Sequence, residues 1–98
     1  MERYRTRNGV VLTSICGEYL LVAAQEARKF CPFCTQISES SAFLWRLLEN
    51  GAEADQLLKA VEEEYEIDDR SSTLQAIDQF VAQMLELGYL LREGDKHA

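Results

Sequence analysis

The first half of the chain carries its hydrophobic residues in short runs separated by turn-forming residues. The runs occupy residues 10–12, 19–22 and 33–37, and Gly17 and Pro32 lie between them. Short apolar runs bounded by glycine and proline are typical of β-strands. We therefore predict a three-stranded antiparallel meander. Because so small a sheet is not stable alone, other elements must cover one of its faces.

The second half changes to the period of an amphipathic helix. Residues 42–48 form one apolar cluster that predicts a short helix, with Ser38 or Ser40 as its N-cap and Asn50-Gly51 as its stop. A second helix is predicted over residues 54–65 because leucine, valine and tyrosine recur there at helical spacing.

A third helix is predicted from Ser72 to Leu87. Ser72 and Gln75 match the S-x-x-Q capping box, and Gly88 is a suitable left-handed terminator. The apolar residues 89–91 are expected to pack back on the core. The predicted order is βββααα, an α+β fold, in a single domain spanning residues 1–98 with its core at about residues 7–91.

Composition and charge restrict the kinds of partner. Ten Lys/Arg against seventeen Asp/Glu give a formal net charge of −7 and a pI near 4.6. Nucleic acids and anionic membranes attract basic surfaces, so this balance argues against both. The longest apolar run, residues 19–24, is too short to span a bilayer, and no basic start leads into an apolar signal segment. A cytoplasmic location is expected.

The residue inventory does not favour catalysis. The one histidine, His97, lies in a polar C-terminal tail, and the five glycines are scattered rather than gathered in a phosphate-binding loop. Without that histidine no Ser/His/Asp or Cys/His constellation can be assembled. We expect a protein that is not an enzyme and that needs no cofactor.

The most distinctive local motif is Cys31-Pro32-Phe33-Cys34. A C-x-x-C pair supplies half of a zinc site, and the remaining ligands would have to come from elsewhere. Cys16 is expected at the opposite end of the meander, about 20 Å away along a six-residue strand. Three interpretations stay open for Cys31 and Cys34: free thiols, a local disulfide, or a small metal or redox module.

The predicted third helix carries two apolar stripes. Ile77, Phe80, Met84 and Leu87 form the expected core face. The second stripe contains Leu74, Asp78, Val81 and Leu85. Two interpretations stay open for the second stripe: the helix is broadly buried, or these residues line a groove for a partner, with Asp78 available to a basic side chain.

Two strings of residues resemble a known family. Residues 37–49, ISESSAFLWRLLE, look like the family stretch L-N-e-t-g-a-x-I-W-x-L-L-d, and residues 80–90, FVAQMLELGYL, are similar to its F-L-x-x-L-x-x-x-G-L-L ending. Gly51 followed by Leu57 matches the spacing between them. These residues resemble the PqqD-like family, the peptide chaperones and recognition elements of ribosomally made, post-translationally modified peptides. The resemblance covers roughly residues 7–91.

The chain departs from the family pattern at several positions. Ser38 stands where asparagine is usual, and Glu53 stands where serine or threonine usually caps the second helix, which predicts a weaker start there. Leu85 and Leu87 are apolar where the family is often polar. The family pattern assigns no role to the Cys31–Cys34 pair.

The resemblance implies a winged-helix-like domain that binds the leader of a precursor peptide. The leader would add as a strand along the third β-strand, in the groove with the third helix, and would be presented to a modifying enzyme, often a radical S-adenosylmethionine enzyme. An exposed strand edge offers unpaired N–H and C=O groups for such pairing. The residues that the resemblance implies for binding are Phe33, Cys34, Thr35, Gln36, Ile37, Leu74, Asp78, Val81 and Leu85.

One function from another class is a winged-helix DNA-binding regulator. Its recognition helix would run from Ser72 to Leu87, where there is no Lys or Arg and where Asp78 and Glu86 would repel phosphates. Charge therefore places this alternative behind peptide binding. The sequence leaves the oligomeric state open between monomer and homodimer.

Overall fold

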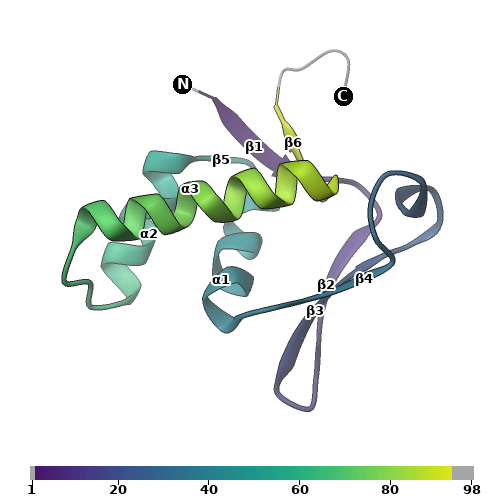
Figure 1. Ribbon diagram of the computed structural model, residues 1–98, viewed down its shortest axis with the longest axis horizontal. Coiled ribbons are helices and arrows are strands. Elements are labelled where there is room, and N and C mark those ends of the chain that lie inside the picture. The colour runs from purple at the N-terminus through teal and green to yellow at the C-terminus, as the bar shows by residue number, and fades with distance from the viewer. Residues whose placement is uncertain (1, 94–98) are drawn as a thin grey trace.

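The structure is a computed structural model that describes residues 2–93. It contains a three-stranded antiparallel sheet, a second small sheet and three α-helices (Figure 1). The elements are β1 (Arg3–Thr6), β2 (Val10–Ile15), β3 (Glu18–Ala23), the 3₁₀ helix η1 (Gln25–Lys29), β4 (Cys34–Ile37), α1 (Glu39–Leu48), β5 (Ala52–Glu53), α2 (Ala54–Glu64), α3 (Arg70–Leu87) and β6 (Leu90–Arg92). Among residues 2–93, no helix is long and apolar enough to cross a membrane.

The predicted meander and the three predicted helices are confirmed. Strands β2, β3 and β4 are neighbours in that order and all pair antiparallel, with Leu21 opposite both Leu12 and Thr35. The three helices follow in the predicted order. The α+β interpretation of the hydrophobic pattern is therefore correct.

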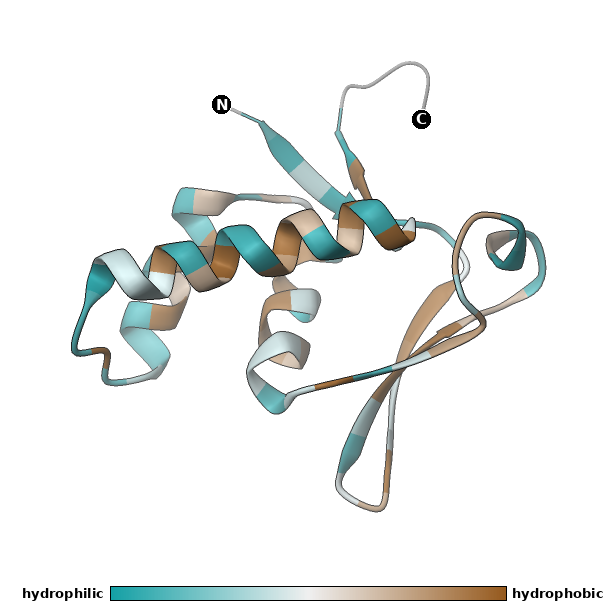
Figure 2. Ribbon diagram, in the orientation of Figure 1, coloured by the Kyte–Doolittle hydropathy of each residue, from teal (hydrophilic) through white to brown (hydrophobic). Residues whose placement is uncertain are grey.

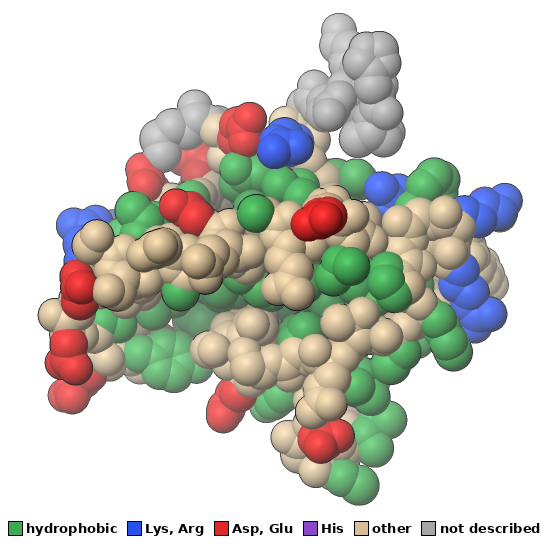
Figure 3. Space-filling view, viewed as in Figure 1, with side chains coloured by type: hydrophobic (Ala, Val, Ile, Leu, Met, Phe, Trp, Pro, Cys, Tyr) green, Lys and Arg blue, Asp and Glu red, His purple; other side chains and the backbone are tan. Residues whose placement is uncertain are grey.

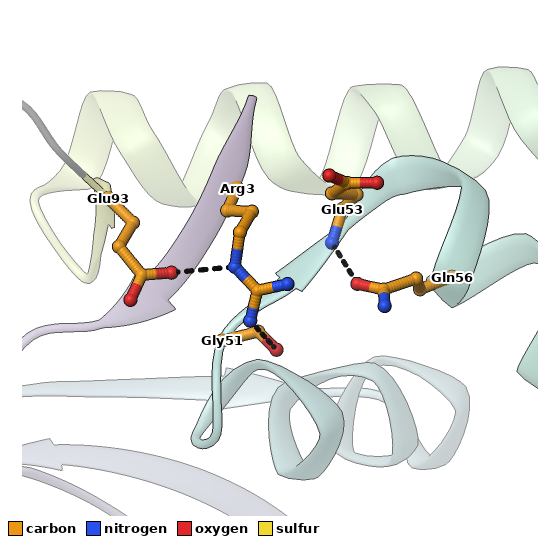
Figure 4. Close-up of polar contacts among 5 residues, drawn as sticks. All are labelled: Arg3, Gly51, Glu53, Gln56 and Glu93. Carbon is orange, nitrogen blue, oxygen red and sulfur yellow. Dashed lines mark hydrogen bonds and ion pairs between the residues drawn. The ribbon is translucent and has the colours of Figure 1, made fainter. Parts of the chain in front are cut away.

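A second sheet, absent from the sequence prediction, joins the beginning and the end of the described chain. Its strand order is β5-β1-β6, so β1 pairs with a strand from the middle of the chain and with one near its C-terminal end. Arg3 on β1 reinforces this arrangement. Its guanidinium donates to the Glu93 carboxylate at 2.9 Å and to the Gly51 carbonyl at 3.1 Å (Figure 4).

The start of α3 differs from the prediction, whereas α2 begins at Ala54 as predicted. Helix α3 begins at Arg70 rather than Ser72, because Asp69 is its N-cap: the Asp69 carboxylate accepts the Ser71 N–H at 3.0 Å and the Ser72 hydroxyl at 2.7 Å. The Ser72 hydroxyl is the main cause of a lowered pKa at Asp69. Helix α2 also has a defined start, since the Gln56 side chain accepts the Glu53 N–H at 2.8 Å (Figure 4).

The core lies where the helices meet the inner faces of both sheets. The largest fully buried side chains come from the meander, α1, α2, α3 and the segment after α3. Figure 2 shows brown segments on each of these elements, alternating with teal along α3. These residues are Leu21, Trp45, Leu48, Leu57, Met84, Tyr89 and Leu90.

The turn that ends α3 requires glycine. Gly88 has φ of +90°, a left-handed conformation that L-residues with side chains rarely adopt. A Cβ atom at this position would also overlap the Phe30 carbonyl oxygen. The predicted terminator is confirmed, and the structure adds that the loop before β4 packs directly against it.

Helix α3 separates two environments. In Figure 1 it runs horizontally, with β1, β5 and β6 above it and β4 below it. The molecule is flat, with principal extents of 40 × 37 × 19 Å. A peptide that contacts β4 therefore meets one side of α3 only.

Candidate functional site: the edge of β4 and its groove

Strand β4 is the outer strand of the meander. It pairs with β3 on one side, and within residues 2–93 no strand pairs with its other side. The Ala23 N–H donates to the Phe33 carbonyl at 2.8 Å, so this pair belongs to the hydrogen-bonded positions of the ladder. Such positions alternate along an antiparallel pair. The backbone groups of Thr35 and Ile37 therefore point toward β3, and those of Cys34 and Gln36 point outward at the free edge.

The side chains of β4 alternate between two faces. Thr35 and Ile37 are half-buried toward the core, whereas Cys34 and Gln36 are exposed on the outer face. Phe33 comes just before the strand and is 57% exposed. The five residues predicted from the third strand thus form one continuous edge, with two of them facing inward.

A groove runs between β4 and α3. Its volume is about 220 Å³. The strand side presents Gln36 and Ile37, and the helix side presents Phe80, Gln83 and Met84. Thr35, Ser38 and Ser41 complete the lining. A side chain of an extended peptide paired with β4 has room to enter here.

The groove is held in shape by Tyr89, which follows α3. Its buried phenol donates to the Pro32 carbonyl at 2.8 Å, and its oxygen lies 2.6 Å from the Thr35 hydroxyl oxygen. Because the phenol proton is used on Pro32, the Thr35 hydroxyl is the donor in the second bond. Burial raises the pKa of the Tyr89 phenol. A neutral side chain therefore connects the end of α3 to β4.

The helix wall predicted from the sequence lies elsewhere. Asp78, Val81 and Leu85 line a separate hollow of about 500 Å³ together with Tyr4 and Arg92 of the second sheet. Val81 is only 4% exposed and belongs to the core. Leu74, the fourth residue of this stripe, is half-buried against the core. The structure therefore does not bring this stripe together with β4.

Two of the helix residues that line the groove beside β4, Phe80 and Met84, are residues that the sequence pattern assigns to the core face. Phe80 and Met84 are buried as expected, yet each also has an edge in the groove beside β4. Gln83 lies between them, exposed and polar. The exposed polar residue Gln83, next to the buried face of α3, was the available sequence signal for the groove. The hydrophobic pattern does not reveal which side of a helix meets which strand.

The three cysteines occupy different environments. Cys31 is buried, donates its S–H to the Ala27 carbonyl at 3.1 Å and has its pKa raised by burial. Cys34 is exposed on β4, and Cys16 is exposed in the turn between β2 and β3, at the far end of the meander as expected. The Cys31 and Cys34 thiols are not joined to each other.

Metal binding finds no support in the part of the chain that the structure covers. Among residues 2–93 no group of three or more His, Cys, Asp or Glu side chains lies close enough together to hold an ion. His97 lies outside the described residues.

The DNA-binding alternative is also weakened by the geometry. The longer α3 gains one basic residue, Arg70, at its first turn, and Arg70 is paired with Glu62 at 3.4 Å. The exposed positions along the rest of the helix include Asp78 and Glu86. This helix does not present the basic surface that phosphate contacts require.

Comparison with known proteins identifies the family. The family model for coenzyme PQQ synthesis protein D (PqqD) matches residues 33–90, which include β4, the three α-helices and the groove between β4 and α3. The chain belongs to the PqqD family. The resemblance read from the two sequence strings is thereby confirmed.

Two solved structures share the PqqD-family fold. TbiB1 in complex with the TbiA(beta) leader peptide is 23% identical, with a TM-score of 0.66 over 92% of this chain and 95% of that one. A lasso peptide synthetase B1 complexed with the leader peptide is 18% identical, with a TM-score of 0.70 over 90% of this chain and 96% of that one. A search of curated proteins gave no significant match.

Proposed function

We propose that this chain binds the leader segment of a ribosomally made precursor peptide as an added strand on β4, and presents it to a modifying enzyme. The observation that carries the proposal is the unpaired edge of β4 beside a groove formed with α3. Family membership and the leader-peptide complexes formed by two proteins of the same fold support it. The chain itself is assigned recognition, and the chemistry is assigned to the partner enzyme.

The edge supplies affinity that does not depend on the sequence of the peptide. The outward N–H and C=O groups of Cys34 and Gln36 offer main-chain hydrogen bonds to any extended chain in register. Selectivity must come from side chains of the peptide that enter the groove beside Phe80, Gln83 and Met84. The groove is small, so it selects by size and shape.

The helix wall of this proposal differs from the one implied by the sequence resemblance. Phe80, Gln83 and Met84 replace Leu74, Asp78, Val81 and Leu85, because only the first set lines the groove beside β4. The strand residues from Phe33 to Ile37 are retained as the binding edge.

The test removes one outward N–H. Gln36→Pro deletes the amide proton at the free edge, and its ladder to β3 remains because Gln36 is not in a hydrogen-bonded pair with that strand. Gln36→Thr is the matched control, since it changes the side chain and keeps the N–H. Ligands are selected from a random 16-residue peptide display library on the full chain, and binding is measured by calorimetry.

We expect binders with a Kd of about 1 μM or tighter and a loss of tenfold or more, about 1.4 kcal/mol, in Gln36→Pro only. Hydrogen exchange gives a second readout. A bound peptide should newly protect the amides of Cys34 and Gln36, while Thr35 and Ile37 are already protected by β3. Failure to select any peptide, or binders insensitive to Gln36→Pro, would contradict strand addition.

A further inference from the structure

The end of the molecule next to the start of β4 carries a basic–aromatic patch. We define this patch by Arg5, Arg7, Arg28, Lys29, Phe30 and Phe33. Figure 3 shows blue side chains interleaved with green ones at this end, over the loop between β3 and β4. Phe30 and Phe33 are 58% and 57% exposed, which is unusual for phenylalanine.

The patch is positive in a protein whose formal net charge is −7. The two segments that build it, residues 5–8 and 24–34, contain one acidic residue, Glu26, which pairs with Lys29 at 3.1 Å. Other basic residues of the described chain, Arg3, Arg70 and Arg92, lie against carboxylates. Within residues 2–93, Arg7 and Arg28 form no ion pair.

Both of these arginines are held in place by neutral partners. Arg7 lies 4.5 Å from the centre of the Phe30 ring and donates through Nε to the Gly88 carbonyl at 2.6 Å. Arg28 lies 4.3 Å from the Phe33 ring centre and donates through Nε to the Ala23 carbonyl at 3.2 Å. Each arginine thus uses its Nε for the hydrogen bond and packs its guanidinium against one face of a phenylalanine ring. The terminal nitrogens, which form the fork that matches a carboxylate, remain available.

A hollow of about 290 Å³ opens within the patch. Arg5, Arg7 and Phe30 line it, and so does Glu26, whose carboxylate is paired with Lys29. Arginine and aromatic side chains together are typical of the residues that dominate binding interfaces. The hollow therefore suits a short acidic side chain flanked by apolar ones.

The position of the patch connects it to the binding edge. Phe33 directly precedes Cys34, the first residue of β4. A peptide paired with Cys34 and Gln36 that continues in the same direction past Cys34 passes over Phe33 and Arg28. At the far end of α3, residues 62–69 contain six acidic residues and no basic one. The two ends of α3 thus differ in charge.

We propose that the basic–aromatic patch binds an acidic segment of the same peptide, immediately beyond the stretch that pairs with β4. This rests on the proposed function, because it takes β4 as the pairing edge. The ligand class is a peptide with Asp or Glu on one flank of its strand-forming stretch. The patch fixes the direction of the peptide, since it lies only beyond the Cys34 end of β4.

The test uses the peptides selected from the random library whose binding is lost in Gln36→Pro. Their sequences are aligned on the strand-forming stretch, and Asp and Glu should be enriched on one flank. Affinity is then measured for Arg28→Gln/Lys29→Gln and for the charge-matched control Lys59→Gln/Arg70→Gln, whose changes lie on α2 and at the start of α3. All four positions are exposed, and thermal melts verify folding.

We expect Arg28→Gln/Lys29→Gln to weaken binding by about three- to tenfold and to flatten its dependence on salt, while the control changes little. Replacing the acidic flank of the peptide by Gln and Asn should remove the difference between wild type and Arg28→Gln/Lys29→Gln. The selected peptides could instead lose binding in Gln36→Pro, lack an acidic flank and bind both double variants equally well. That result would overturn the role of the patch and leave strand addition standing. The absence of any Gln36-dependent peptide would overturn both.

Discussion

The hydroxyl of Thr35 donates to the phenol oxygen of Tyr89 across 2.6 Å, joining the binding edge to the turn after α3. Tyr89 is fully buried, and its ring also meets the Trp45 ring edge-on at 6.4 Å. A buried core residue therefore connects β4 to the turn after α3, on either side of the groove.

Removing the Tyr89 phenol oxygen tests how much this connection stabilises the fold. Tyr89→Phe leaves the Thr35 hydroxyl and the Pro32 carbonyl without their partner, so we expect the free energy of unfolding in urea to fall by about 1–2 kcal/mol. The control is Tyr65→Phe, because Tyr65 is exposed, its hydroxyl forms no hydrogen bond within residues 2–93, and its ring contact with Phe43 is kept. Equal stability of the two variants would show that the bonds at Tyr89 contribute nothing.

Substitutions on the two sides of α3 can show whether the peptide lies in the groove beside β4 or in the hollow beside the second sheet. Gln83 faces β4, and its neighbour Ala82 faces the hollow beside the second sheet. Both are exposed, so tryptophan is tolerated at each. We expect Gln83→Trp to fill the groove and weaken binding of a Gln36-dependent peptide by about tenfold or more, a loss of about 1.4 kcal/mol.

Ala82→Trp is the control for that substitution and should bind the peptide as the wild type does. Calorimetric titration of both variants with the same peptide decides the matter. If Ala82→Trp is the weaker binder, the peptide lies on the side of Asp78 and Leu85, and the helix wall first inferred from the sequence is the correct one.

The buried Cys31 thiol predicts a pH dependence of stability. Burial raises its pKa in the folded state above the value of about 8.5 found in unfolded chains. The unfolded state therefore loses this proton first. The stability contributed by Cys31 is complete below about pH 8.5 and is lost as the pH rises through the folded pKa.

The measurement is the urea midpoint at pH 7.5 and pH 9.5. Wild type should lose stability between these values, and Cys31→Ser, which keeps a donor for the Ala27 carbonyl without a group that titrates in this range, should lose less. Lysines and surface groups affect both proteins equally. An identical fall in the two would show that the Cys31 thiol titrates in the folded protein as it does in the unfolded chain.

The sequence predicted the larger elements because each carried a clear period. It missed the second sheet for a physical reason: β5 and β6 have two and three residues, β1 is mostly polar, and pairing β1 with β6 joins segments more than 80 residues apart. Such short strands have no period of their own. Tertiary pairing creates them.

The strand residues that the sequence resemblance implies lie on the free edge of β4, whereas the helix residues that it implies line a different hollow. Periodicity located both apolar stripes of α3, but they flank one buried arc, and Val81 falls inside that arc. Which flank meets β4 depends on how α3 is rotated against the sheets. That rotation follows from packing of residues such as Leu21, Trp45 and Met84, which no local pattern encodes.

The pairing of β1 with β6 has a practical consequence for experiments. Figure 1 shows β1 and β6 on the side of α3 opposite β4. The pairing continues just beyond β6, where the Glu93 N–H donates to the Arg3 carbonyl at 2.8 Å. The described part of the chain thus begins and ends away from the peptide edge, which favours attaching an affinity tag, a fluorophore or a fused protein at an end of the chain. Immobilising the chain through an end should therefore leave the β4 surface open to a ligand in solution.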